Sequence, residues 1–106
     1  ARYAQYLAAS GFPTRVVKTD DLAAIRRRAG VPPALASCHT VVAGTYFVEG
    51  HVPAPAVARL LREGPPVRGI ALPGMPPGSP GMDGVQAGPL VVYAVAPDGV
   101  REFARF

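Results

Sequence analysis

The chain has 106 residues, of which 49% are hydrophobic and 17% are charged. This length and apolar content predict one globular domain, residues 1–106, with a single core, and exclude a highly charged disordered chain. The formal net charge is +4, but the basic run Arg26–Arg28 has no aromatic side chains around it, so we expect a solvated helix face and no nucleic-acid binding. The sequence has no run of about 20 apolar residues, so it predicts no membrane span. Its single cysteine excludes an internal disulfide.

The first ten residues are expected to form a helix. Apolar side chains recur there at helical spacing, and Gly11 then supplies the residue that commonly follows a helix end. The residues at this spacing are Tyr3, Tyr6, Leu7 and Ser10. Because a helix that begins a chain without a cap leaves amide groups unpaired, we expect further residues to precede Ala1 and regard the domain as N-terminally incomplete.

A strand, a second helix and a hairpin are predicted next. The β-branched residues of Thr14–Lys18 favour a strand, and Thr19, Asp20 and Asp21 are N-cap residues for a helix that ends at Gly30. The expected buried face of that helix is Leu22, Ile25 and Ala29. Residues Thr40–Val42 and Thr45–Val48 then read as two antiparallel strands that turn at Ala43–Gly44.

The third helix is expected to begin near Pro53 and Pro55 and to end at Gly64. Its predicted inner face is Val57, Leu60 and Leu61. Residues 69–88 contain four prolines and six glycines, a composition that predicts a long loop without regular structure. A closing hairpin is expected from Leu90–Ala96 and Val100–Phe106. The predicted class is therefore α/β, in the order αβαββα followed by a C-terminal hairpin.

Five side chains with sulfur or imidazole groups lie near turns or element boundaries, where they are candidates for metal binding. They are Cys38, His39, His51, Met75 and Met82. Thiolate and thioether ligands select Cu(I), and imidazole also suits copper, so copper is the expected metal. His51 lies near the start of the third predicted helix, where the partial positive charge keeps an imidazole neutral and able to bind metal.

The alternatives to metal binding differ from residue to residue. Cys38 fits equally a small buried hydrophobe, or a catalytic thiolate with His39 or His51 as base. In a regular strand Cys38 and His39 would point to opposite faces, which disfavours a metal shared by both. Met75 and Met82 fit either metal contacts or apolar anchors of the Pro-Gly-rich loop.

Three segments, the last of them in several pieces, resemble the CopG-like metal-binding family, long catalogued as a domain of unknown function. They are Ser37–Thr40, Val48–Ala54, Gly69–Ala71 with Pro73–Pro76, and Gly78–Met82. The resemblance implies a bacterial periplasmic protein with a thioredoxin-like fold, linked to copper resistance. It also implies a first strand with a Cys-x-Cys-Cys motif ahead of the first helix, and this chain contains neither.

Three functions follow as hypotheses. The first is a periplasmic copper-binding protein, without an enzymatic activity of its own, that exchanges copper with a donor or acceptor protein. The second is a thioredoxin-like thiol-disulfide oxidoreductase, because such folds place reactive cysteines at helix N-termini. The third is an interaction module in which the Pro-Gly-Met loop forms an adaptable contact surface.

Overall fold

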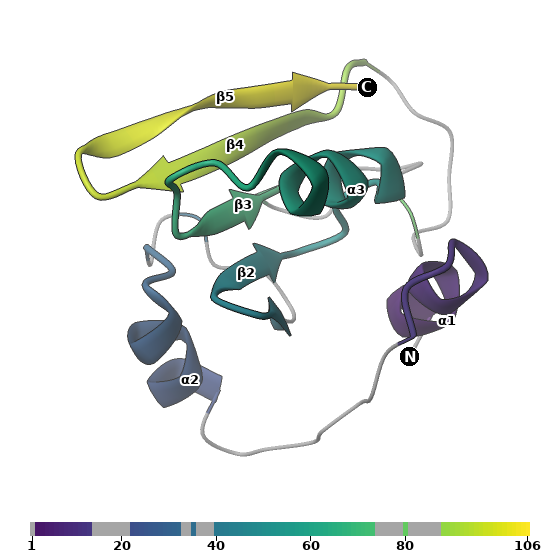
Figure 1. Cartoon of the computed structure of the whole chain (residues 1–106), viewed down its shortest axis with the longest axis horizontal. Coiled ribbons are helices and arrows are strands. Elements are labelled where there is room, and N and C mark those ends of the chain that lie inside the picture. Colours follow the sequence, from purple (N-terminus) through teal and green to yellow (C-terminus); the bar gives the residue numbers. More distant parts are fainter. Residues whose placement is uncertain (1, 14–21, 33–34, 36–39, 74–79, 81–87) are drawn as a thin grey trace.

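The described residues form a mixed α/β fold of three helices and one five-stranded sheet (Figure 1). The computed structural model describes residues 2–13, 22–32, 35, 40–73, 80 and 88–106. Among these residues the helices are α1 (Arg2–Ala9), α2 (Leu22–Ala29) and α3 (Ala54–Glu63). The strands are β1 (Thr40–Ala43), β2 (Tyr46–Glu49), β3 (Gly69–Ala71), β4 (Val91–Ala96) and β5 (Gly99–Arg105). No helix in this part of the chain is long and apolar enough to cross a membrane.

The strands lie side by side in the order β1-β2-β3-β4-β5. The hairpins β1–β2 and β4–β5 are antiparallel, as the sequence predicts, and β3 joins them by pairing in parallel with β2 and antiparallel with β4. The first turn lies at Gly44–Thr45, one residue later than expected. The predicted strand Thr14–Lys18 and its following cap residues lie outside the described residues.

The presence of β3 corrects the expectation that residues 69–88 contain no regular structure. Gly69 begins this strand because its missing side chain makes room for its neighbour: a Cβ there would lie 2.3 Å from the carbonyl oxygen of Phe47 and 2.5 Å from the Phe47 ring. Pairing on both edges then compensates for the weak strand propensity of glycine. Three buried residues suffice for a strand when both of its neighbours are already in place.

The two faces of the sheet carry different side chains because neighbouring residues of a strand point in opposite directions. Val48 belongs to a large cluster with α1 and α3. Phe47 belongs to a smaller cluster, together with Val31 just after α2. The large cluster consists of Tyr3, Leu7, Val48, Val52, Ala56, Val57, Leu60, Ile70, Leu72, Leu90, Val92 and Ala94. The core is therefore divided by the sheet, with α1 and α3 packed against one face.

Helix α3 confirms the predicted start and end but corrects its inner face. Pro53 precedes its first residue, and Gly64 adopts a left-handed conformation with φ of 58° as the C-cap. Val57 and Leu60 are buried, as expected, whereas Leu61 is 45% exposed. The other buried residues of the helix are Ala54 and Ala56, and Ala56 joins Val57 and Leu60 in the large cluster.

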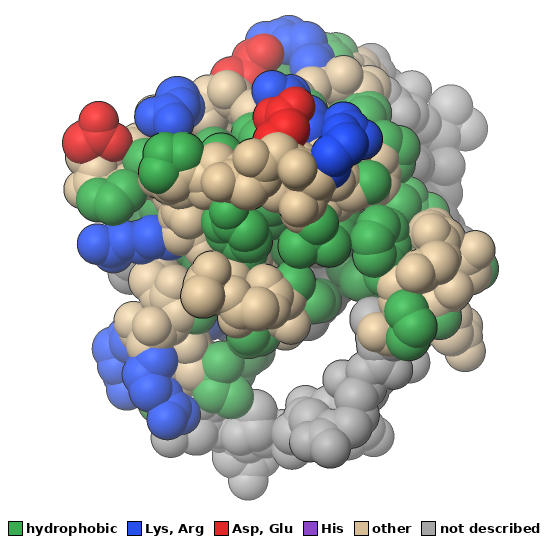
Figure 2. Space-filling view, in the orientation of Figure 1, with side chains coloured by type: hydrophobic (Ala, Val, Ile, Leu, Met, Phe, Trp, Pro, Cys, Tyr) green, Lys and Arg blue, Asp and Glu red, His purple; other side chains and the backbone are tan. Residues whose placement is uncertain are grey.

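Helix α2 is less buried than its predicted apolar face suggests. Leu22, Ile25 and Ala29 are half-buried, and none of its residues is fully buried. The space-filling view shows Lys and Arg side chains over α2, while the acidic side chains on that face of the molecule lie over α3 and the β4–β5 hairpin (Figure 2). Arg27 and Arg28 are exposed, as a solvated face requires, but Arg26 is not.

Candidate functional site

The end of β2 and its connection to α3 contain the buried polar residues of the described core. All residues from Glu49 to Ala54 are buried, and Glu49 and His51 are the polar members of the core among the residues that the structure describes. Gly50 has a φ of 82°, a left-handed conformation that suits glycine, and its carbonyl accepts a hydrogen bond from the amide of Val52 at 3.0 Å. This tight bend turns the His51 side chain into the interior directly before α3.

His51 is 6% exposed, and its ring contacts a distant part of the chain. The Nδ1 atom lies 2.5 Å from the carbonyl oxygen of Pro80. A carbonyl oxygen only accepts hydrogen bonds, so Nδ1 carries a proton in this contact, and the neutral form of such a ring has its lone pair on Nε2. The contact connects the bend before α3 to the Pro-Gly-rich segment, in agreement with the prediction that His51 lies near the start of that helix.

Two tyrosines of α1 pack against this bend. The Tyr3 hydroxyl donates to the carbonyl oxygen of Val52 at 2.5 Å, and its ring centroid lies 5.4 Å from that of His51. The Tyr6 ring stacks on Tyr3, with centroids 5.8 Å apart. Its hydroxyl oxygen accepts a hydrogen bond from the amide of Ala54 at 2.7 Å. Because Pro53 provides no side-chain cap, Tyr6 caps α3 from another helix.

Burial changes the acidity of this cluster. The pKa of Tyr3 is raised well above its ordinary value of about 10, chiefly because burial penalises the phenolate and also because Tyr6 lies close by. Tyr3 is therefore a neutral hydrogen-bond donor throughout the physiological range. The sequence places both tyrosines on one helix face, and the uncapped proline start of α3 was the available sign that another element must supply an acceptor.

A second buried polar cluster lies at the open end of the β1–β2 hairpin. The Glu49 side chain has 0% exposure, and one of its oxygens lies 2.8 Å from Nη2 of Arg26. The Thr40 hydroxyl donates to its other oxygen and accepts from Nε of Arg26 at 3.2 Å. This cluster corrects the expectation that Arg26 belongs to a solvated helix face. A glutamate that ends an otherwise apolar strand was the sequence signal for it.

The remaining predicted ligands lie outside the described residues: Cys38, His39, Met75 and Met82. Within the described part of the chain, no group of three or more His, Cys, Asp or Glu residues is placed to hold a metal ion. The structure therefore brings together His51 and Pro80. The set of five candidate metal ligands stays a prediction.

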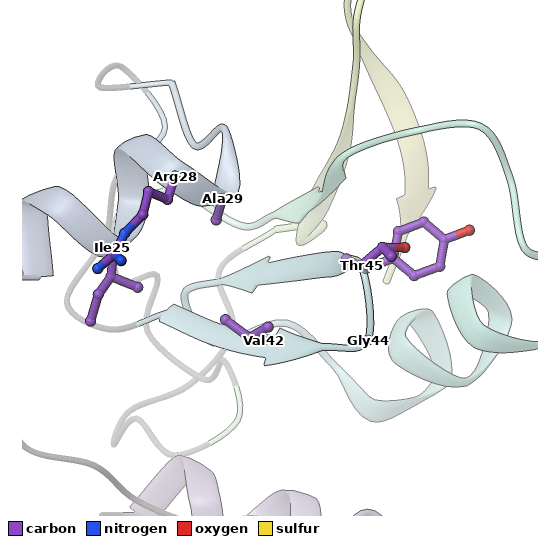
Figure 3. Close-up of a pocket in the computed structure, with 7 residues that line it drawn as sticks. Ile25, Arg28, Ala29, Val42, Gly44 and Thr45 are labelled. Carbon is purple, nitrogen blue, oxygen red and sulfur yellow. The ribbon is translucent and has the colours of Figure 1, made fainter.

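A shallow hollow of about 300 Å³ lies elsewhere, between α2 and the β1–β2 hairpin (Figure 3). Ile25, Arg28 and Ala29 line it from the helix, and Val42 from β1. The hairpin turn completes the lining with Gly44, Thr45 and Tyr46. His51, the candidate metal ligand that the structure describes, does not line this hollow, so the buried bend before α3 is the better candidate site.

Comparison with known proteins places this fold and these segments in one family. A protein-family model described as "protein of unknown function, DUF411" matches residues 35–82, which include all five candidate ligands. No curated protein sequence matches the chain.

Two solved structures, both titled copper resistance protein CopG, are 38% identical in sequence to this chain. Form 2 superposes with a TM-score of 0.89, and the match covers 99% of this chain and 86% of that one. For form 1 the TM-score is 0.90, and the match covers 99% and 85% of the two chains. The chain therefore belongs to the DUF411 family and is a homologue of the copper resistance protein CopG.

Proposed function

We propose that this protein binds copper and takes part in copper handling or resistance in the periplasm. Its similarity to the structures titled copper resistance protein CopG, at 38% identity over 99% of the chain, supports a copper-related function. The observation that carries the proposal is the contact between His51 Nδ1 and the Pro80 carbonyl oxygen. In the proposed site His51 binds the metal through Nε2.

The chemistry of this histidine fits a metal ligand. Metal-binding histidines typically donate the N–H of their second nitrogen to a carbonyl or carboxylate oxygen, which fixes the tautomer and the orientation of the ring. Pro80 supplies that carbonyl, and the Tyr3 ring packs beside the imidazole. The ring is therefore oriented before any metal arrives.

The soft ligands of the proposed site lie close to these contacts along the chain. Met82 follows Pro80 by two residues, and Cys38 precedes Thr40 by two residues. Both residues are therefore neighbours in sequence of groups that contact the bend or the strand leading into it. With Met75, and with His39 as a further candidate, they form a donor set that prefers Cu(I) to harder cations.

The thioredoxin-like fold and the exchange partner belong to the same proposal. The division of the core by the sheet, with α1 and α3 on one face, is compatible with a thioredoxin-like domain. A periplasmic protein that donates or accepts copper would be the partner. Copper is then a cargo of the protein, and no enzymatic turnover is required of it.

Anaerobic titration of Cu(I) against a chromophoric chelator tests this function. His51→Asn is the informative variant, because the asparagine amide can still donate to Pro80 in place of Nδ1 while the Nε2 ligand is lost. We expect the variant to fold normally and to bind Cu(I) about 10–100-fold more weakly. Cys38→Ser and the double variant Met75→Leu with Met82→Leu test the sulfur ligands. Cu(I) affinity that none of these changes lowers would overturn the proposal.

A further inference from the structure

Glu49 is the point at which three segments of the chain are joined. Its side chain is fully buried and binds Arg26 of α2 and Thr40 of β1. Its backbone carbonyl accepts a hydrogen bond of 3.0 Å from the amide of Leu72, directly after β3. One residue therefore fixes a helix, the start of β1 and the end of β3.

Stability alone gives little reason for this buried charge. Removing two charges from water costs as much as their attraction returns, and well-packed apolar residues of similar volume usually serve the fold equally well or better. However, the Arg26 guanidinium binds one oxygen of the Glu49 carboxylate and the Thr40 hydroxyl binds the other, so both the position and the orientation of the carboxylate are fixed. The cluster thus supplies geometric precision.

The elements that it joins are next in sequence to the segments that carry the proposed ligands. Thr40 and Glu49 are direct cross-strand partners, the first residue of β1 and the last residue of β2. Cys38 lies two residues before Thr40, and His51 lies two residues after Glu49. Leu72 leads into the segment that contains Met75 and Pro80. All three ligand-bearing segments are therefore adjacent in sequence to residues that this cluster joins.

We propose that Arg26, Thr40 and Glu49 act as positioning residues for the copper site. The inference rests on the proposed function and deepens it. The three side chains do not bind metal themselves. They hold the start of β1, which follows Cys38 in sequence, and the end of β2, which precedes His51, at a fixed spacing. The Glu49 backbone also holds Leu72, directly after β3, through a hydrogen bond.

The test replaces the whole cluster by apolar residues of similar volume, Arg26→Met with Thr40→Val and Glu49→Leu, in the full chain. This avoids leaving one buried charge without its partner. We expect cooperative unfolding at an undiminished urea midpoint but Cu(I) affinity about tenfold or more below that of the parent protein. The control, Glu102→Leu with Arg105→Met, removes an exposed ion pair on β5 and should leave Cu(I) affinity unchanged. Equal affinities in the cluster variant and the parent would overturn the inference.

If the triple replacement does not fold, two single variants of Thr40 test the inference instead. Thr40→Ser retains the hydroxyl and Thr40→Val removes it at nearly constant volume. The positioning role predicts parent-like Cu(I) affinity for the serine variant and weaker binding for the valine variant. Equal binding by the two variants would contradict it.

The 15N chemical shifts of the His51 ring provide a readout in metal-free protein. In the parent protein they should report a proton on Nδ1, and in the cluster variant they should move toward a mixture of tautomers as the Pro80 contact loosens. If no protein binds Cu(I) but this change occurs, the proposed function fails while the positioning of His51 stands. Unchanged shifts in a folded cluster variant would refute the positioning role whatever the copper result.

Discussion

The Tyr3 hydroxyl donates a hydrogen bond to the carbonyl oxygen of Val52 across 49 positions of the chain. It attaches the first helix to the bend that carries His51. Since both groups are buried, water cannot easily replace the bond. The contact therefore couples the stability of α1 to the geometry of the candidate site.

Tyr3→Phe should destabilise the protein by about 1–3 kcal/mol, because it removes the donor from a buried carbonyl while keeping the ring. Urea unfolding followed by circular dichroism measures this loss. The matched control is Tyr46→Phe, whose hydroxyl donates to the half-buried carbonyl of Pro65 at 2.7 Å. Water can reach that carbonyl, so the control should cost less than about 1 kcal/mol. A larger loss in the control would contradict the burial argument.

Alkaline pH should lower the free energy of unfolding of the metal-free protein, because Tyr3 ionises more readily in the unfolded chain. Its pKa is raised in the folded state by burial and by the neighbouring Tyr6, and the His51 ring, which is also titratable, packs beside it. The unfolded chain releases this proton near pH 10, before the folded protein does, so the stabilising contribution is complete below pH 10 and is lost as the pH rises further. Unfolding free energies at pH 8 and pH 11 should therefore diverge less in Tyr3→Phe than in the parent protein.

Neighbouring leucines of α3 should respond very differently to truncation. Leu60 has no exposed surface and lies in the large cluster, so Leu60→Ala should cost about 2–5 kcal/mol. Leu61 is 45% exposed, and Leu61→Ala should cost under about 1 kcal/mol. Equilibrium unfolding of the two variants compares the same chemical change one residue apart. Similar losses would contradict the orientation of the helix.

Gly69→Ala should be among the most harmful small substitutions. The added methyl group would overlap the backbone and ring of Phe47, so β2 and β3 must separate, at a cost of about 1–3 kcal/mol or more. In Gly88→Ala the new Cβ meets no atom within 4 Å, which makes this variant the matched control. Thermal unfolding midpoints distinguish the two, and a stable Gly69→Ala protein would show that the strands pack less closely than described.

Local sequence signals predicted the helices and hairpins because their causes are local. The proline start and glycine end of α3, and the turn residues Gly44 and Asp98, act within a few residues. The same signals could not reveal β3, whose stability comes from pairing with β2 and β4. They also assigned Leu61 to the inner face, because periodicity alone does not resolve which side of a short helix meets the sheet.

The candidate site was predictable only in part for the same reason. Residue chemistry and the resemblance of short segments pointed to His51 and to copper. Nothing in the sequence assigns Pro80 as the partner of His51 or Glu49 as the partner of Arg26, because both contacts join distant segments. The tyrosine contacts of the bend likewise depend on how α1 docks.

The parallel pairing of β2 with β3 has a consequence for the order of folding. Each antiparallel hairpin closes through a turn of a few residues, whereas the parallel pairing of β3 with β2 spans the long crossover connection that contains α3. Distant contacts pay a larger loop-closure entropy and form more slowly. A refolding chain should therefore acquire its hairpins first and the Tyr3–His51 ring contact late, so that an intermediate with most of its strands would still lack an ordered imidazole.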